Sequence, residues 1–220
     1  MRRSFAVILL LAACVVDRSV HAHSAKEKLL MEYSRHGNLT GVQKLISEGV
    51  DVNAEDPLKR RPLHYAATSD YVNVVQALVE FGAKVNAEDF ENRTPLHFAA
   101  QFDRVNVIRA LIELGANVNV ENNRGETPLH CAVNIARVNA VRVLVELGAN
   151  MEAANTYLEE TPLHYAAKFG MMDVARALIE LGANLKVENK NKLTPRQLAE
   201  KLGRTKVATI LKEAENKTPM

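Results

Sequence analysis

The sequence Thr94-Pro95-Leu96-His97 returns at Thr127–His130 and Thr161–His164, with variants at Arg61–His64 and Thr194–Gln197. The five copies begin at residues 61, 94, 127, 161 and 194, which gives steps of 33, 33, 34 and 33 residues. A chain that repeats at one fixed period of this length folds as stacked copies of a small unit, and each copy buries its apolar side on its neighbours. Function is therefore to be sought on a surface rather than in a pocket.

The unit that begins at Asp89 predicts two short helices. Thr94 suits the N-cap of the first, and Pro95 suits its first position, where a missing N–H costs nothing. A second helix is predicted after the turn near Asp103, and Gly115 ends it because glycine adopts a left-handed cap at little cost. The second helix is recognised by apolar residues at helical spacing, namely Val105, Ile108, Leu111 and Ile112.

These residues resemble the ankyrin repeat, a unit of about 33 residues with a hairpin finger and two antiparallel helices. The resemblance extends from Lys26 to Ala214 and includes a closing glycine in each unit. It implies an all-α solenoid of stacked helix-turn-helix units with hairpin fingers. We expect a capping repeat at 23–54, full repeats at 55–87, 88–120, 121–154 and 155–187, and a second capping repeat at 188–216.

Two departures from the family pattern lie close together in the chain. The turn between the paired helices normally carries glycine, and Ala136 stands there in one unit, where a left-handed conformation costs alanine roughly 1 to 2 kcal/mol. The 34-residue step places one extra residue within Asn155–Glu160. An insertion in a repeat array is expected in a loop, often on the binding side.

The charge balance argues against nucleic acid as the main ligand. The chain has 220 residues, 28 basic and 26 acidic, and a formal charge of +2. Residues 1–22 hold three of the basic and one of the acidic residues, so the rest has 25 of each. Phosphate binding needs a concentrated positive surface. The hydrophobic content of 47% is sufficient for one ordered domain with a continuous core.

The first 22 residues predict a signal peptide. Arg2 and Arg3 precede an apolar run, and Val20-His21-Ala22 offers small residues at a cleavage point after Ala22. A secreted or periplasmic location follows. Alternatively, Leu11-Ala12-Ala13-Cys14 resembles a bacterial lipobox, with a lipoprotein signal at 1–13 and membrane attachment through a lipid on Cys14. An uncleaved anchor or a chance apolar run is the third interpretation of this segment.

Catalytic and metal-binding interpretations are weaker than structural ones. His64, His97, His130 and His164 occupy the same place in successive units, and the family resemblance implies that they link adjacent turns by hydrogen bonds. Cys131 stands where other units carry an aromatic residue, so it is interpreted as a small hydrophobic residue; an enzyme with a site near this thiol is the competing hypothesis. We expect no catalytic residue, no metal and no cofactor.

Binding is expected at positions that vary between repeats, since the resemblance implies a concave surface of fingers and inner helices that holds other proteins. Exposed aromatic residues are enriched at interfaces. As an alternative, Phe102 and Phe169 pack on neighbouring helices, or form with Ile135 an apolar stripe across three repeats. The candidate residues are Phe90, Arg124, Tyr157 and Leu158 in the fingers and Gln101, Phe102, Asn134, Ile135, Lys168 and Phe169 on the inner helices.

The sequence therefore predicts a monomeric, non-enzymatic module, exported from the cytoplasm, that binds a protein partner. Two alternatives describe its setting. One is a periplasmic or envelope accessory protein, lipidated or not, that supports an enzyme or assembly. The other is a secreted effector that binds a host protein.

Overall fold

The computed structural model describes residues 25–217, and within them the chain forms helices, turns and loops without a strand. The predicted signal and lipobox segments lie outside these residues. A first helix occupies residues 25–35, and pairs of helices follow. They are α2 (Leu39–Ser47), α3 (Pro62–Ala66), α4 (Val72–Glu80), α5 (Pro95–Gln101), α6 (Val105–Glu113), α7 (Pro128–Asn134), α8 (Val138–Glu146), α9 (Pro162–Phe169), α10 (Met172–Glu180), α11 (Pro195–Lys201) and α12 (Thr205–Lys217).

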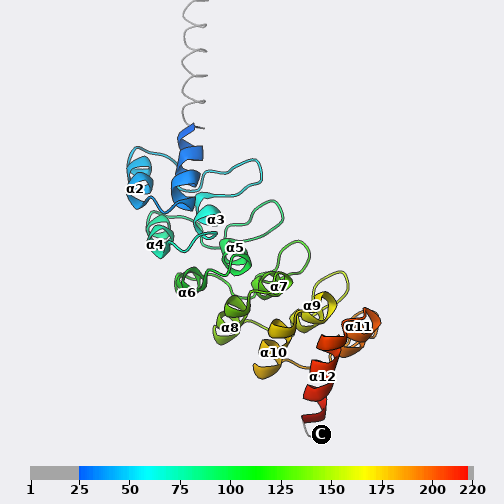
Figure 1. Ribbon diagram of the computed structural model, residues 1–220. Coiled ribbons are helices and arrows are strands. Elements are labelled where there is room, and N and C mark those ends of the chain that lie inside the picture. The colour runs from blue at the N-terminus through cyan, green and yellow to red at the C-terminus, as the bar shows by residue number, and fades with distance from the viewer. Residues whose placement is uncertain (1–24, 218–220) are drawn as a thin grey trace, which may run out of the picture.

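The helices form two stacked rows, which confirms the all-α repeat solenoid (Figure 1). Helices α3, α5, α7 and α9 make the inner row, and α4, α6, α8 and α10 make the outer row. Each helix packs on its counterpart in the next repeat and on the other helix of its own pair. The finger loops all project from the side of the inner row.

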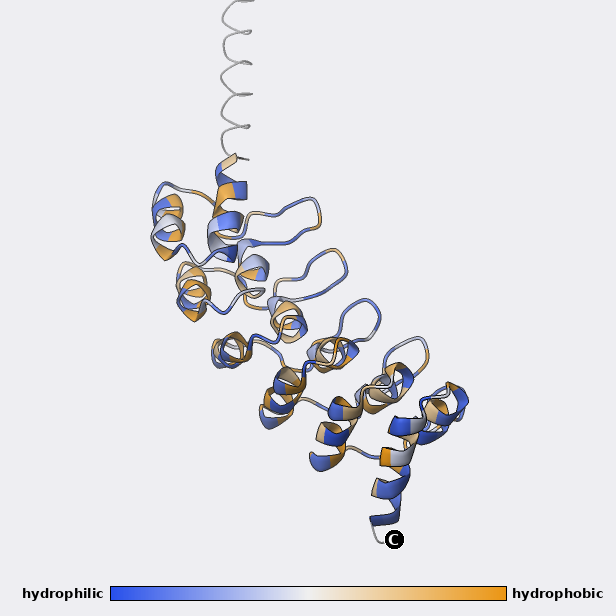
Figure 2. Cartoon of the chain, viewed as in Figure 1, coloured by the Kyte–Doolittle hydropathy of each residue, from blue (hydrophilic) through white to orange (hydrophobic). Residues whose placement is uncertain are grey.

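Each inner helix and each outer helix contributes one leucine to the centre of the core. Leu63, Leu96, Leu129 and Leu163 of the inner helices are buried, and so are Leu78, Leu111, Leu144 and Leu178 of the outer ones. Figure 2 shows both hydrophobic and hydrophilic residues on the outer helices, as expected where one side packs on the stack and the other meets solvent. The core therefore continues from repeat to repeat.

The helix boundaries agree with the sequence signals. Helix α5 begins at Pro95 with Thr94 as its N-cap, as predicted. Gly115 follows α6 with a φ of 94°, in the left-handed region. The buried face of α6 differs in detail from the predicted one, since Val107 and Ala110 belong to it whereas Val105 and Ile112 are half-buried at its edges.

The extra residue lengthens a single finger, as predicted. In the preceding repeats, the backbone hydrogen bond that closes the finger loop runs from the N–H of one residue to the carbonyl of the fourth residue after it. An example is the bond from the Asp89 N–H to the Arg93 carbonyl at 2.9 Å. In the inserted finger the bond runs from Asn155 N–H to the fifth residue, Glu160, at 3.1 Å. The helix pairs on either side keep their stacking, so the insertion is absorbed in the loop.

The left-handed turn residue between paired helices has a second role that the sequence did not reveal. Asp103 has a φ of 60° there, and its carboxylate accepts hydrogen bonds from the Asn139 side chain at 3.1 Å and the Ala140 N–H at 2.8 Å of the next repeat. Ala136, with a φ of 56°, adopts the same conformation without a side chain that can accept. The contact between its repeat and the next therefore lacks this polar link.

Candidate functional site

The fingers and the inner-helix ends form one continuous surface, which we call the finger-side face. It consists of the loops that precede α3, α5, α7, α9 and α11 and of the C-terminal ends of these helices. Adjacent fingers are joined by single backbone hydrogen bonds, as from Phe90 N–H to the Leu58 carbonyl at 2.9 Å and from Thr156 N–H to the Arg124 carbonyl at 3.0 Å. The fingers are therefore held in register with one another.

Each finger is organised by its first residue. The Oδ1 atom of Asp89 accepts the N–H groups of Glu91 and Arg93, both at 2.9 Å, and Asn122 binds Arg124 and Glu126 in the same way. This role was missed at the sequence level, although an Asp or Asn at the same place in every repeat was a usable signal. Such side-chain bonds to the backbone replace the pairing that a strand would supply.

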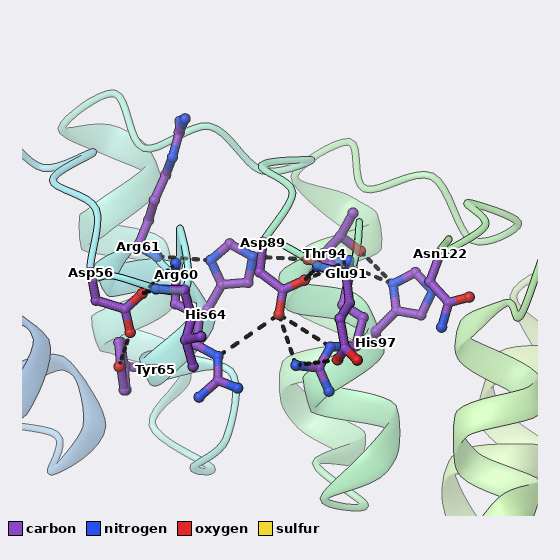
Figure 3. Close-up of polar contacts among 12 residues, drawn as sticks. Asp56, Arg60, Arg61, His64, Tyr65, Asp89, Glu91, Thr94, His97 and Asn122 are labelled. Atoms are coloured by element: carbon purple, nitrogen blue, oxygen red, sulfur yellow. Dashed lines mark hydrogen bonds and ion pairs between the residues drawn. The ribbon is translucent and has the colours of Figure 1, made fainter. Parts of the chain in front are cut away.

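The repeated histidines link adjacent repeats, which confirms their structural role (Figure 3). The Thr94 N–H donates to Nδ1 of His97 at 3.0 Å, so the proton of the neutral ring sits on Nε2. That Nε2 donates to the Glu126 carbonyl of the next finger at 3.1 Å. Burial lowers the pKa of His97 and of His130 to about 4, which keeps both rings neutral.

A buried carboxylate lies between two fingers. Asp89 pairs with Arg93 at 2.9 Å, and the Arg60 guanidinium of the preceding repeat lies 3.8 Å away (Figure 3). Burial alone would raise the pKa of the Asp89 carboxyl, but hydrogen bonds from Arg93 and from backbone amides outweigh it, and the pKa is lowered. Asp89 is thus an ionised, fully bonded structural group.

Most of the predicted binding residues are exposed. Phe90 and Tyr157, in the fingers, expose 61% and 65% of their surface, and at the inner-helix ends Phe102 and Phe169 expose 40% and 45%. The predicted binding residues Ile135, Arg124 and Asn134 are exposed as well, whereas Gln101, Leu158 and Lys168 are half-buried.

Lys168 is committed to internal contacts. Its Nζ atom pairs with the buried Glu160 at 2.9 Å and lies 5.8 Å from the centres of the Tyr165 and Phe169 rings. The Phe169 ring also meets Tyr165 edge-on, with centres 6.0 Å apart. Part of the Phe169 surface is therefore used against Tyr165 of its own helix α9, whereas the packing alternative placed the ring against a neighbouring helix, and nearly half of the residue stays exposed.

Arginines cross the expected apolar stripe. Phe102, Ile135 and Phe169 occupy equivalent positions, but the Arg137 Nε donates to the Gln101 carbonyl at 3.4 Å and the Arg104 Nε to the Thr68 carbonyl at 2.9 Å. Guanidinium groups thus connect the inner-helix ends of successive repeats. The finger-side face is therefore mixed aromatic and cationic rather than purely apolar, and the candidates from the sequence included Arg124 and Lys168 but missed Arg104 and Arg137.

Cys131 has the properties of a packing residue. Burial and the nearby Glu126 carboxylate raise the pKa of its thiol to about 12, so the thiolate is scarce at neutral pH. The small polar pocket beside it, about 130 Å³, is lined by Gln101, Asn122, Arg124, Asn134 and neighbouring groups. Within residues 25–217, at this pocket or at any other place, no three His, Cys, Asp or Glu side chains form a group that could hold a metal ion.

Comparison with protein families agrees with the geometry. A family model described as ankyrin repeats (3 copies) matches residues 30–122, 91–155, 114–189 and 150–219, which together span nearly all of the described chain. No curated protein matches the chain significantly. None of the helices in the described stretch combines the length and apolar character that a membrane crossing requires.

Proposed function

The chain belongs to the ankyrin repeat family, and on this premise we propose that it is a non-enzymatic module that binds a protein partner through its finger-side face. Repeats of this family indicate protein–protein interaction in general; the use of this face, the partner and the location are our proposal. A stacked array offers an extended, rigid surface, and binding then depends on shape and chemical complementarity.

The observation that carries the proposal is the exposure of aromatic rings on fingers whose backbone is fixed. Phe90 and Tyr157 are the most exposed of the large hydrophobic side chains in residues 25–217. Aromatic anchors of this kind supply much of the binding energy at protein interfaces. Because hydrogen bonds already order the fingers, little further entropy is lost when a partner binds.

The absence of catalysis is part of the same proposal. The histidines use both ring nitrogens in bonds that hold the stack, as His130 does between Thr127 and Glu160, and a ring so engaged is poorly placed to move a proton. The raised pKa of Cys131 makes its thiol a weak nucleophile. Both features favour a scaffold over a reactive site.

We further propose that the chain is exported, since residues 1–22 carry the pattern of a signal peptide. Mass spectrometry of the protein from its native source tests this. Cleavage after Ala22 leaves His23 as the first residue, whereas the lipoprotein alternative leaves an acylated Cys14. A chain that retains Met1 or its immediate neighbours would contradict export by either route.

The binding proposal is tested by affinity capture from the extracytoplasmic fraction of the native organism. The full chain is compared with a variant in which Phe90, Phe102, Tyr157 and Phe169 are changed to Ser. We expect the natural chain to retain a partner that the variant loses. Phe81→Ser is the matched control, because Phe81 is also an exposed aromatic residue but ends the outer helix α4.

The control should retain the partner as well as the natural chain does, and urea unfolding should show that the four-serine variant is folded. Capture of the same proteins by the natural chain and the four-serine variant would place the interface elsewhere. Loss of the partner with Phe81→Ser alone would move it to the outer row.

A further inference from the structure

We propose that a cationic groove near the N-terminal end of the finger-side face takes an acidic segment of the partner, one in which Asp or Glu side chains flank an aromatic or aliphatic residue. This inference rests on the proposed function and specifies the chemistry of the partner. The groove has a volume of about 490 Å³ and extends over the first three repeats. Its principal side chains are Arg35, Arg60, Arg104, Tyr65, Phe98 and Phe102.

The guanidinium groups in the groove keep most of their charge available. Arg35 lies over the Tyr65 ring, 4.7 Å from its centre, and within residues 25–217 it forms no ion pair with a carboxylate. Arg60 lies over the Phe98 ring at 5.4 Å; its Nε atom is buried and lies 3.8 Å from Asp89, and the side chain as a whole is 27% exposed. Stacking on a ring holds a guanidinium in place without neutralising it.

Among residues 25–217 no carboxylate lines the groove, and of the acidic residues beside it Asp70 and Asp103 accept hydrogen bonds from the Asn106 and Asn139 side chains. Asp56 accepts the Tyr65 hydroxyl at 2.6 Å and two backbone N–H groups. Asp89 is bonded to Arg93 and lies 3.8 Å from Arg60. Glu32 lies 3.3 Å from the His36 ring, a contact that is an ion pair only when that ring is protonated. The groove therefore offers donors and positive charge that its own acidic neighbours do not satisfy.

The groove is assembled by contacts between repeats that are in place before anything binds. The Ser69 hydroxyl donates to the Arg35 carbonyl at 2.7 Å, and the Arg104 Nε donates to the Thr68 carbonyl at 2.9 Å. The Tyr71 ring packs directly on Gly37, where a Cβ would collide with it. Preorganisation of this kind lowers the entropy lost on binding.

A planar guanidinium can bind a carboxylate through two parallel hydrogen bonds, and the aromatic rings between the arginines can pack against an apolar side chain. An acidic, partly apolar peptide satisfies both requirements at once. Single-stranded nucleic acid also uses arginines and aromatic rings, but it needs a positive surface that follows its backbone. Beyond residue 22 the chain has 25 basic and 25 acidic residues, so the positive charge is local to the groove.

The test begins with a displayed library of random peptides of about 12 residues, selected on the purified full chain. We expect enrichment of Asp and Glu beside Phe, Tyr, Leu or Ile, since three arginines face one groove. One selected peptide is then titrated by fluorescence anisotropy against the natural chain, an Arg35→Gln/Arg60→Gln variant and an Arg176→Gln control. Arg176 is exposed on the outer helix α10 and lies outside the groove.

The double variant should weaken binding by about tenfold or more, because truncating interface charges has effects of this size, whereas the control should stay within about twofold. The same peptide with Asn and Gln in place of Asp and Glu, which needs no variant protein, should also bind at least about tenfold more weakly. A single-stranded RNA of equal length should bind less tightly than the acidic peptide.

Selection without acidic enrichment, equal binding of the amide peptide, or an unaffected double variant would overturn the inference. Tighter binding of the RNA would overturn it in favour of nucleic acid. If these peptide tests fail while the four-serine variant still loses its captured partner, the binding proposal stands and only the acidic-segment inference falls.

Discussion

The Nε2 atom of His130 donates to the Glu160 carbonyl at 3.1 Å across 30 residues, whereas the equivalent bond from His64 to Arg93, also 3.1 Å, spans 29. The hydrogen bond from the histidine to the next finger is therefore kept despite the inserted residue. Because the length and the partner atom are preserved, the extra residue changes the shape of one finger and leaves the spacing of the repeats unchanged.

Acidification is expected to destabilise the stack between about pH 6.5 and 4. Burial lowers the pKa of His97 and His130 from 6.5 to about 4, so the unfolded chain binds more protons in this interval. Their contribution is complete above about pH 6.5 and is lost as the pH falls towards the folded pKa. The loss is about 3 kcal/mol for each ring, at about 1.4 kcal/mol per pKa unit.

Urea unfolding at about pH 7.5 and about pH 4.5 measures this loss. The control is His97→Gln/His130→Gln, because Gln197 at the equivalent position accepts the Thr194 N–H at 2.9 Å without titrating in this range. The free energy of unfolding of the control should depend less on pH. Equal pH dependence in the two chains would contradict the assignment to these histidines.

Gly125→Ala is expected to destabilise the chain more than Gly203→Ala. The two glycines have φ values of 70° and 68°, so the backbone strain of an alanine is similar, roughly 1 to 2 kcal/mol. At Gly125 an added Cβ would also lie 2.7 Å from the backbone nitrogen of Thr156 in the inserted finger, whereas at Gly203 nothing lies within 4 Å. Urea unfolding of both variants tests this, and equal losses would refute the crowding between these fingers.

Ala136→Gly is expected to raise the free energy of unfolding by about 1 kcal/mol, since glycine relieves the left-handed strain but costs some chain entropy. Ala136→Asp should gain less than glycine does. Asp173 stands where the preceding repeats offer Asn106 and Asn139 as donors, so a carboxylate at position 136 meets another carboxylate. A larger gain from Asp than from Gly in urea unfolding would argue against this account.

Leu111→Ala is expected to cost about 2 to 5 kcal/mol, because the side chain is completely buried in the core. Phe102→Ala should cost much less, since 40% of that residue is exposed at the helix end. Urea unfolding compares the two variants. Similar losses would mean that the Phe102 ring serves the core rather than a partner.

Cys131 is expected to resist iodoacetamide in the folded chain at about pH 8, because a thiol with a pKa of about 12 is almost entirely protonated there. In urea the thiol regains an ordinary pKa, near 8.5, and should react quickly. Mass spectrometry after timed quenching measures both rates. Rapid alkylation of the folded chain would revive the hypothesis of a reactive site at this residue.

Much of the fold could be predicted because its signals are local. Thr94 and Pro95 marked the start of α5, and Gly115 the end of α6, as the structure has them. The shared position of the histidines pointed to a structural role, and the 34-residue step located the insertion. Each of these depends on backbone preferences and period, which a short stretch of sequence carries by itself.

The candidate site could be predicted only in part, because exposure and pairing depend on neighbours from other repeats. Phe90 and Tyr157 were correctly expected on the surface. Lys168, chosen for its variability, instead pairs with the buried Glu160. Arg35 and Arg60 gave no signal in the sequence, since neither belongs to a motif and 25 residues separate them.

The sequence by itself determined the repeat unit, its period and the caps of its helices, because hydrogen-bonding residues and apolar spacing act within a few helical turns. Only the tertiary structure decided which side chains meet on the finger-side face. The offset between successive repeats brings the Arg104 Nε to the Thr68 carbonyl and places Arg35 and Arg60 in one groove. That offset is set by packing along the whole stack, so no single repeat contains it.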